Sequence, residues 1–187
     1  MLGATSFARG LAAFGEAFGE LAASSTPPFV LTRPMVDLRP LRIGALLGGL
    51  AGEAVFARRV LGLGPGPARD HARTFARAAV AGGRLGAAAV RTRRSLLPPR
   101  DDLDDRFCDE TARAWGEPLP AELAGVLPRI TEATPARFAA GLLAALDRSR
   151  MIERFDEDWY RNPRAAEALR ALAAEPEAPV KIGRAHV

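Results

Sequence analysis

Few residues in this sequence could carry out catalysis or hold a metal ion. His71 is the only histidine before residue 181, so no histidine pair can bind zinc and no serine–histidine pair is evident. Cys108 is the only cysteine, and no histidine lies near it in sequence to activate its thiol. We therefore expect a surface or capping histidine, a thiol that packs as a small apolar group, and neither a catalytic residue nor a cofactor in this chain.

Four aspartates cluster within five positions and contain an Asp-Asp-x-x-Asp pattern. They follow a proline pair and are Asp101, Asp102, Asp104 and Asp105. In an all-helical protein this pattern resembles the magnesium-binding motif of isoprenoid synthases, which lies inside a helix beside an apolar cavity and works with a second acidic motif. No second motif is clear here, and carboxylates at a helix start are stabilised by the helix dipole. Acidic residues at a helix start are therefore the favoured interpretation, and a magnesium-dependent synthase-like protein is the less favoured one.

Arginines form a stripe along the helix predicted over residues 67–97. Five of them fall within about 80° of each other on a helical wheel, and they are Arg69, Arg73, Arg77, Arg84 and Arg91. Arginine suits phosphate groups, but the stripe has no aromatic interleaving. Two of the 26 basic residues lie in residues 181–187, so the rest of the chain has a net charge of only +2 against its 22 acidic residues. We expect an anion-binding or partner-binding face, or a solvated one, and no nucleic-acid partner.

The elements that must position these residues are predicted to be helices. The chain has 187 residues, 48% hydrophobic and 26% charged, which suits one domain with a core and excludes disorder. Apolar residues recur at spacings of three and four almost throughout, so we predict an all-α fold, an irregular single-domain bundle of about six to seven helices. The expected helices cover residues 5–23, 41–61, 67–97, 101–116, 120–127, 134 to beyond 152, and 163–174, with an extended connector over 29–40.

The apolar spacing also predicts which helix faces turn inward. Glycines at 15 and 19, and at 44, 48 and 52, are expected to let neighbouring helices approach closely. The expected inward residues are Phe7, Leu11, Phe14, Phe18 and Leu21 in the first helix, Ala72, Phe75, Ala79, Gly82, Gly86 and Val90 in the helix over 67–97, and Phe138, Leu142, Ala145, Ser149 and Ile152 in the helix from 134. Phe155, Trp159 and Tyr160 are expected to lock two helices together.

The sequence favours a cytoplasmic protein with no membrane partner. Its best apolar run, Ile43 to Leu50, is far shorter than the roughly 20 residues of a membrane-spanning helix. No cleaved secretion signal follows Met1, and a single cysteine excludes an internal disulfide.

The last seven residues differ from the rest of the chain. All 25 arginines but one precede them, and they contain the only lysine, Lys181. Back-translated, residues 181–187 are similar to a common short-read sequencing adapter in one reading frame. We therefore interpret them as a non-native tail, take residues 1–180 as the helical domain, and expect that domain to be a fragment of a larger protein.

The C-terminal half carries a family resemblance. The run Glu153-Arg154-Phe155-Asp156-Glu157-Asp158-Trp159-Tyr160-Arg161-Asn162-Pro163-Arg164-Ala165 resembles the C-terminal segment of zinc metallopeptidases of the thimet oligopeptidase and oligoendopeptidase type. Residues 134–146 are similar to the helix that follows the substrate-contacting loop of that family. The resemblance implies that Arg137, Phe138 and Leu142 face substrate and that the full-length protein binds zinc.

The sequence also departs from that family. Its zinc-binding His-Glu-x-x-His motif is absent, and Phe138 and Leu142 stand near the place of tyrosines that stabilise an oxyanion. We therefore expect the chain to be inactive alone, as the C-terminal helical portion of a metallopeptidase-like protein that packs against the missing upstream part of the same protein. The alternative is a free-standing helical interaction or scaffold domain that binds a protein partner through the arginine stripe or the glycine-rich helix.

Overall fold

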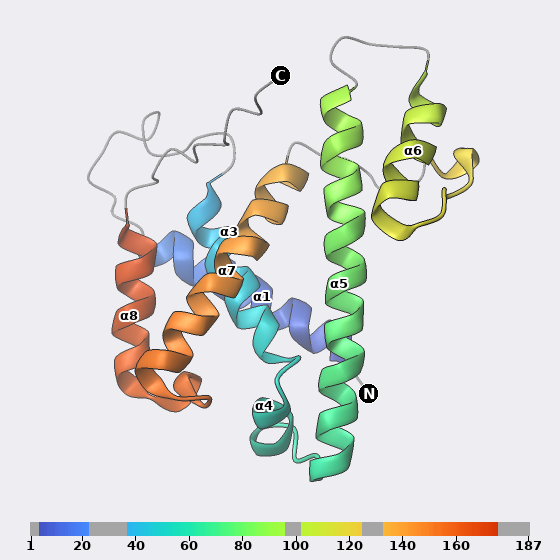
Figure 1. Cartoon of the computed structure of the whole chain (residues 1–187). Helices are drawn as coiled ribbons and strands as arrows, with labels where there is room; N and C mark the ends of the chain where they lie inside the picture. Colours follow the sequence, from blue (N-terminus) through green and yellow to red (C-terminus); the bar gives the residue numbers. More distant parts are fainter. Residues whose placement is uncertain (1–3, 23–36, 96–101, 125–132, 176–187) are drawn as a thin grey trace.

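All regular structure in the described part of the chain is helical. The computed structural model describes residues 4–22, 37–95, 102–124 and 133–175. Its elements are α1 (Ala4–Ala22), α3 (Leu38–Leu50), α4 (Ala54–Arg59), α5 (Pro65–Ser95), α6 (Leu103–Trp115), α7 (Ala133–Phe155) and α8 (Pro163–Ala174), with short 3₁₀ turns at η1 (Ala121–Leu123) and η2 (Trp159–Arg161) (Figure 1). The predicted all-α bundle is confirmed by these seven α-helices, and residues 125–127 of the helix expected over 120–127 lie outside the described ranges.

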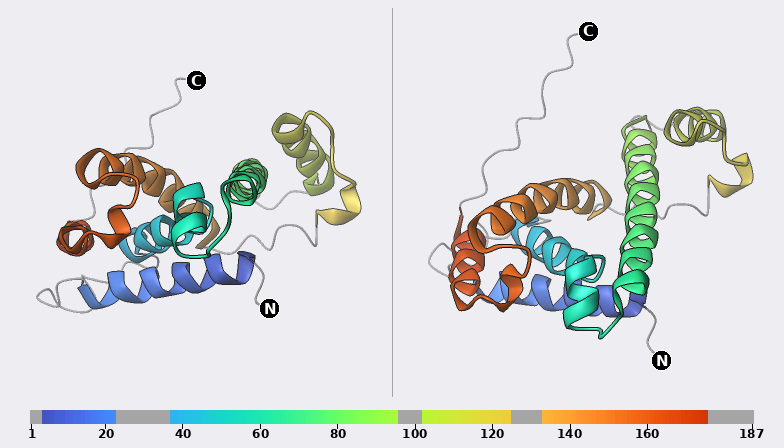
Figure 2. Two further views of the ribbon diagram at one scale, coloured as in Figure 1. Left: turned by 90° about the horizontal axis from the view of Figure 1, so that it is seen from below. Right: turned by 60° about the horizontal axis from the view of Figure 1, so that its bottom comes forward.

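Helix α3 lies at the centre of the fold. α1 packs on one side of it and α7 on another, α8 closes one end, and α5 stands beside this group with α6 on its far side (Figure 2). The core gathers around α3, whose Ile43, Leu46, Leu47 and Leu50 are buried together with Phe56, Met151 and Trp159. Within the described residues, none of the helices combines the length and apolar character that crossing a membrane requires.

Glycines bring α1 and α3 into close contact. A Cβ atom placed on Gly15 would lie 2.8 Å from Cα of Gly44, and one on Gly19 would lie 2.8 Å from Cα of Pro40. A Cβ on Gly48 would meet that of Ala12 at 3.1 Å. The predicted close approach is confirmed for these glycines, because any larger side chain would push the two backbones apart.

The expected inward stripe of α1 is partly wrong. Leu11 and Phe18 pack against the core, but Phe14 is 64% exposed and Leu21 is 87% exposed. The two glycines determine which face turns inward, because only they allow α3 to come close. Phe14 and Leu21 are rotated by about 80–100° from the line of Leu11 and Gly15 and therefore point away from α3.

The helix expected over residues 41–61 is two helices. α3 already begins at Leu38, where the Asp37 carboxylate accepts the Arg39 backbone N–H at 2.9 Å, so the end of the expected connector is helical. The helix ends at Leu50 because the chain turns there to bring Gly52 against Phe75 of α5, where a Cβ would overlap the ring. Gly52 therefore packs against α5, whereas Gly44 and Gly48, which were predicted to share its face, pack against α1.

Helix α7 turns a different face to the core from the one expected. Its buried residues are Ala140, Ala144, Asp147 and Met151, on the side opposite to the predicted stripe. The reason is a buried ion pair: Asp147 Oδ1 accepts a hydrogen bond from Arg42 Nη2 at 2.6 Å, and Oδ2 accepts one from Arg42 Nε. These hydrogen bonds raise the pKa of the Arg42 guanidinium above its ordinary value, although burial acts in the opposite direction.

The predicted aromatic contact at the end of α7 is confirmed. Trp159 is only 1% exposed, and Tyr160 packs edge-on against Phe56 with ring centroids 5.1 Å apart. Asn162 then caps α8 by accepting the Arg164 backbone N–H at 3.0 Å, with Pro163 at the first helical position. This segment joins α4, α7 and α8.

Candidate functional site

Helix α5 packs along α6 and α4 but touches α3 and α7 at few points. His71 Nε2 donates to the carbonyl oxygen of Ala51 at 2.6 Å, which makes it the bridging residue between α5 and the end of α3. Phe75 packs on Gly52, and Gly86 packs on Phe138 of α7. Of the nine residues over 76–84, eight are exposed. The middle of α5 is therefore uncovered in the described part of the chain, and only the ends of its expected inward stripe are in contact.

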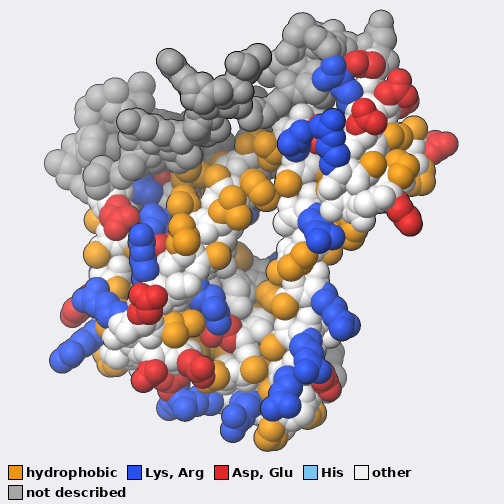
Figure 3. Space-filling model, viewed as in Figure 1, with side chains coloured by type: hydrophobic (Ala, Val, Ile, Leu, Met, Phe, Trp, Pro, Cys, Tyr) orange, Lys and Arg blue, Asp and Glu red, His pale blue; other side chains and the backbone are white. Residues whose placement is uncertain are grey.

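An open groove lies between this part of α5 and α7. It has a volume of about 510 Å³ and is lined by Ala79, Gly82, Gly83 and Gly86 of α5 and by Arg137, Phe138, Gly141 and Leu142 of α7. The space-filling view shows the hollow between α5 and the rest of the molecule, with apolar side chains along its edges (Figure 3). The structure thus brings together the three residues that the sequence singled out, Arg137, Phe138 and Leu142.

Two glycines of the groove, Gly83 and Gly141, were missed by the sequence interpretation, and Gly82 and Gly86 were expected only as inward-facing residues of α5. Built Cβ atoms on Gly82, Gly83 and Gly141 would meet nothing within 4 Å. The signal that could have found them is a pair of adjacent glycines in the middle of a long helix, where glycine is unfavourable.

The apolar face of α7 continues along the groove. Leu142 and Leu146 are each 59% exposed, and Ala145 and Ser149 are exposed as well. Farther along, a second hollow of about 470 Å³ between α5 and α7 includes Phe75 and Ile152. The stripe predicted to face the core is therefore open at Leu142, Ala145 and Ser149, whereas Ile152 packs against the core as predicted.

The charged side chains at the groove already have partners. Arg137 Nη1 donates to Glu16 Oε1 of α1 at 2.7 Å, and Arg148 Nε donates to Glu53 Oε1 at 2.6 Å. Among the described residues, no group of three or more histidine, cysteine or acidic side chains is arranged to hold a metal ion. This chemistry suits an apolar polypeptide surface more than acid–base catalysis.

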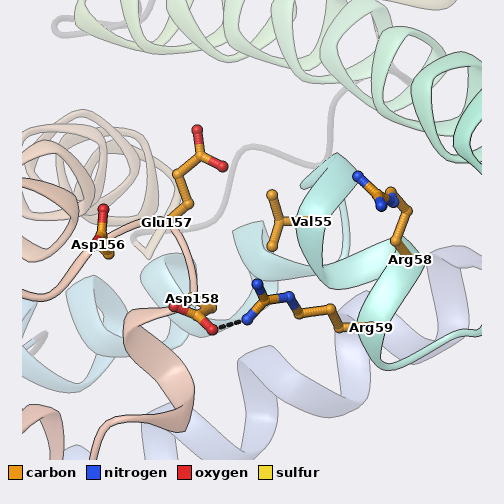
Figure 4. A pocket seen from close by; sticks show the side chains of 6 residues that line it. All are labelled: Val55, Arg58, Arg59, Asp156, Glu157 and Asp158. Carbon is orange, nitrogen blue, oxygen red and sulfur yellow. Dashed lines mark hydrogen bonds and ion pairs between the residues drawn. The ribbon is translucent and has the colours of Figure 1, made fainter.

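A smaller pocket of about 360 Å³ lies between α4 and the turn that follows α7. Its lining is strongly charged and consists of Val55, Arg58, Arg59, Asp156, Glu157 and Asp158. Arg59 Nη1 forms an ion pair with Asp158, and the three acidic side chains do not converge on one point (Figure 4). Asp156 has a φ of 74°, and its N–H bonds to the Ile152 carbonyl oxygen at 2.9 Å, which ends α7. We interpret this pocket as the ionic link that holds the turn on α4.

The arginine stripe of α5 divides into two parts. Arg69, Arg73, Arg77 and Arg84 are exposed, and in the described residues only Arg73 has an acidic neighbour, Asp70 at 3.9 Å. Arg91 instead forms an ion pair with Glu110 of α6. Arg91 therefore takes part in the α5–α6 contact, and its place on a partner-binding face stays a prediction.

The described aspartates of the cluster and Cys108 lie at or near the ends and contacts of α6. Asp102 precedes α6 and accepts from Arg106 Nε at 2.8 Å, whereas Asp104 and Asp105 are exposed in the first turn of that helix. Asp101 lies outside the described residues. Cys108 is half-buried, with Sγ 3.4 Å from the carbonyl oxygen of Leu119.

Comparisons with known proteins give no match: no protein-family model, no curated protein and no solved structure matches this chain.

Proposed function

We propose that this chain is a helical interaction module that holds an apolar α-helix of another polypeptide segment in the groove between α5 and α7. The observation that carries the proposal is the pair of glycines in the exposed middle of α5. Each helix-interior glycine costs about 0.5–1 kcal/mol relative to alanine. A Cβ atom placed on Gly15, Gly44, Gly52 or Gly86 would lie closer than 3.4 Å to a neighbouring atom, whereas one on Gly82 or Gly83 would meet none of the described atoms within 4 Å. A closely packed helix from another segment would give these two glycines the same role as Gly15, Gly44, Gly52 and Gly86.

The opposite wall of the groove supports the same occupant. Leu142 of α7 lines the groove and exposes more than half of its surface, and a helix laid between α5 and α7 would cover it. Because Arg137 and Arg148 already pair with Glu16 and Glu53, the groove offers little free charge. The partner helix should therefore contact the groove through an uncharged, apolar face that includes small side chains.

The test is a titration with a neutral amphipathic peptide helix whose apolar face carries alanine and leucine. We expect calorimetry to detect binding to the full chain. Gly83→Leu and, on the other wall, Gly141→Leu should each weaken binding roughly tenfold or more, because the new side chain fills the groove. Gly10→Leu is the matched control, since Gly10 is an exposed helical glycine on α1 with nothing within 4 Å of a built Cβ. Equal binding by all four proteins would contradict the proposal.

A second candidate function is the wall of a substrate cleft in a metallopeptidase-like protein. It is favoured by one observation: Arg137, Phe138 and Leu142, the residues selected by the family resemblance, line a single groove. In that function the groove binds an extended substrate peptide, and an upstream part of the full-length protein provides the zinc site. Tighter binding of an unstructured peptide than of the helical one, weakened by Phe138→Ala, would favour it. Chelator-sensitive cleavage by the chain alone would contradict the expectation that the chain is inactive by itself.

A further inference from the structure

The outer side of α5, beside α6, carries a second exposed apolar surface. It is a shallow hollow of about 370 Å³ lined by Ala76, Arg77, Val80, Ala81 and Arg84 of α5 and by Trp115 of α6. Val80 is 57% exposed and Trp115 is 41% exposed. We call these six residues the outer α5 face.

Two arginines flank the apolar centre of this face without an acidic partner. Within the described ranges, Arg77 and Arg84 form no ion pair, whereas Arg42, Arg91, Arg137 and Arg148 all do. Val80 follows Arg77 by three residues and precedes Arg84 by four, so it lies between them on the helix surface. The two guanidinium groups are spaced by two helical turns, about 10 Å along the axis.

Trp115 is held in place beside these arginines. It ends α6, where Gly116 adopts a left-handed conformation with a φ of 87°. The following chain returns onto α6, because the Leu119 N–H donates to Thr111 Oγ1 at 3.0 Å and Thr111 is fully buried. The backbone of Trp115 is therefore fixed at the end of α6 before any partner binds.

We propose that the outer α5 face binds an acidic amphipathic helix of a partner protein, with two carboxylates about two turns apart on either side of a large apolar side chain. The carboxylates pair with Arg77 and Arg84, and the apolar side chain packs on Val80 and Trp115. A nucleic-acid backbone fits less well, because the centre of this face is apolar and only two guanidinium groups flank it. The inference is independent of the groove between α5 and α7, which lies on another side of the helix.

The experiment uses a synthetic helical peptide with two glutamates seven residues apart and leucine between them. We expect it to bind the full chain, with an affinity that falls as salt rises, and to shift the fluorescence of Trp115. The shift should vanish in Trp115→Phe, because the other tryptophan, Trp159, is buried. The double variant Arg77→Gln/Arg84→Gln should weaken binding about tenfold, and a peptide with both glutamates changed to glutamine should weaken it similarly.

The matched control is Arg164→Gln/Arg170→Gln, which removes two exposed arginines from α8. It should bind the peptide as the unmodified chain does, and circular dichroism should show the same helix content in all variants. Equal binding of the glutamine peptide, or equal binding by the Arg77/Arg84 variant, would overturn the proposal. Tighter binding to random duplex DNA than to the peptide, or concentration-dependent dimerisation abolished by the same variant, would overturn it in favour of a nucleic acid or a second copy.

Discussion

Two helix surfaces in the described part of the molecule are lined by glycine, and the described residues cover only one of them. Between α1 and α3, Gly15 and Gly44 lie so close that a methyl group on either would meet backbone atoms. Between α5 and α7, Gly82 and Gly83 lie in the open. Glycine therefore allows close helix packing between α1 and α3, whereas these two glycines between α5 and α7 have no described helix packed on them. We propose that the groove between α5 and α7 is the binding surface.

On the covered side, which includes α1, α3 and the α3–α7 contact, the helices are held by polar contacts as well as by close packing. Arg42 of α3 and Asp147 of α7 form an ion pair in which Asp147 retains 4% and Arg42 14% of side-chain exposure. On the open side, by contrast, α5 is held mainly by single side chains such as His71 and Phe75. Mutations should therefore have large effects on stability at the covered side and small ones at the open side.

The largest effect is expected from Arg42→Met. Removing one partner leaves Asp147 buried, with only Arg150 near it at 3.6 Å, and should lower the free energy of unfolding by about 3 kcal/mol. Urea denaturation measures this loss. The double variant Arg42→Met/Asp147→Leu should recover most of it, since no charge is then left buried; a double variant as unstable as the single one would contradict the role given to the ion pair.

Gly15→Ala should be the next most damaging change. The added methyl group would lie 2.8 Å from Gly44 Cα and from the Ile43 carbonyl oxygen, so α1 and α3 must separate, at a cost of about 2 kcal/mol. Gly10→Ala in the same helix has open space around it and should be neutral or slightly stabilising. If thermal unfolding showed the same midpoint for both variants, the close contact between α1 and α3 would be disproved.

Tyr160 offers a test that depends on pH. Burial raises the pKa of its hydroxyl, and within the described residues that hydroxyl has no hydrogen-bond partner. The folded state then binds the proton more tightly than the unfolded state, so stability should fall as pH rises from about 10 through the raised pKa. Tyr160→Phe should remove this fall and change stability at neutral pH by about 1 kcal/mol or less, in the stabilising direction.

The hydroxyl can be followed directly, because Tyr160 is the only tyrosine of the chain. Its tyrosinate absorbance should have a midpoint above the ordinary value of about 10. A midpoint at or below that value would show that the aromatic contact beside Phe56 is open to solvent.

The smallest effect is expected on the open side, with the opposite sign. Gly83→Ala should stabilise the chain by about 0.5–1 kcal/mol, because alanine favours the helix and nothing lies within 4 Å of the added atom. Thermal unfolding beside Gly15→Ala makes the comparison in one experiment. A loss of stability at position 83 would show that the groove is already occupied by the chain itself.

How far the sequence predicts this molecule depends on the range of the contacts involved. Helices, caps such as Asn162 and the glycine contacts of α1 follow from spacings of three and four residues. The face that α7 turns inward does not, because it is set by the Arg42–Asp147 pair, whose members are 105 residues apart. The break after Leu50 likewise depends on Phe75, which belongs to another helix.

Only the part of the candidate site that depends on spacing within one helix was predictable from the sequence. Apolar spacing along α7 selected Phe138 and Leu142, and the family resemblance selected them together with Arg137. Spacing alone cannot distinguish an apolar face that the chain covers itself from one that it leaves open, so the stripe was expected to face the core. The glycines at 82, 83 and 141 complete the groove only once α5 and α7 are placed side by side.

Amide hydrogen exchange of the full chain, with and without the neutral helical peptide, tests the central claim most directly. Free α5 should exchange quickly over residues 76–84, while residues 43–50 of α3 should be strongly protected. Binding should increase protection over residues 76–86 of α5 and 138–149 of α7 and leave α3 unchanged. Protection that instead appears on α8, or no change over residues 76–86 when the peptide is bound, would contradict the claim that the open glycine-lined groove is the binding surface.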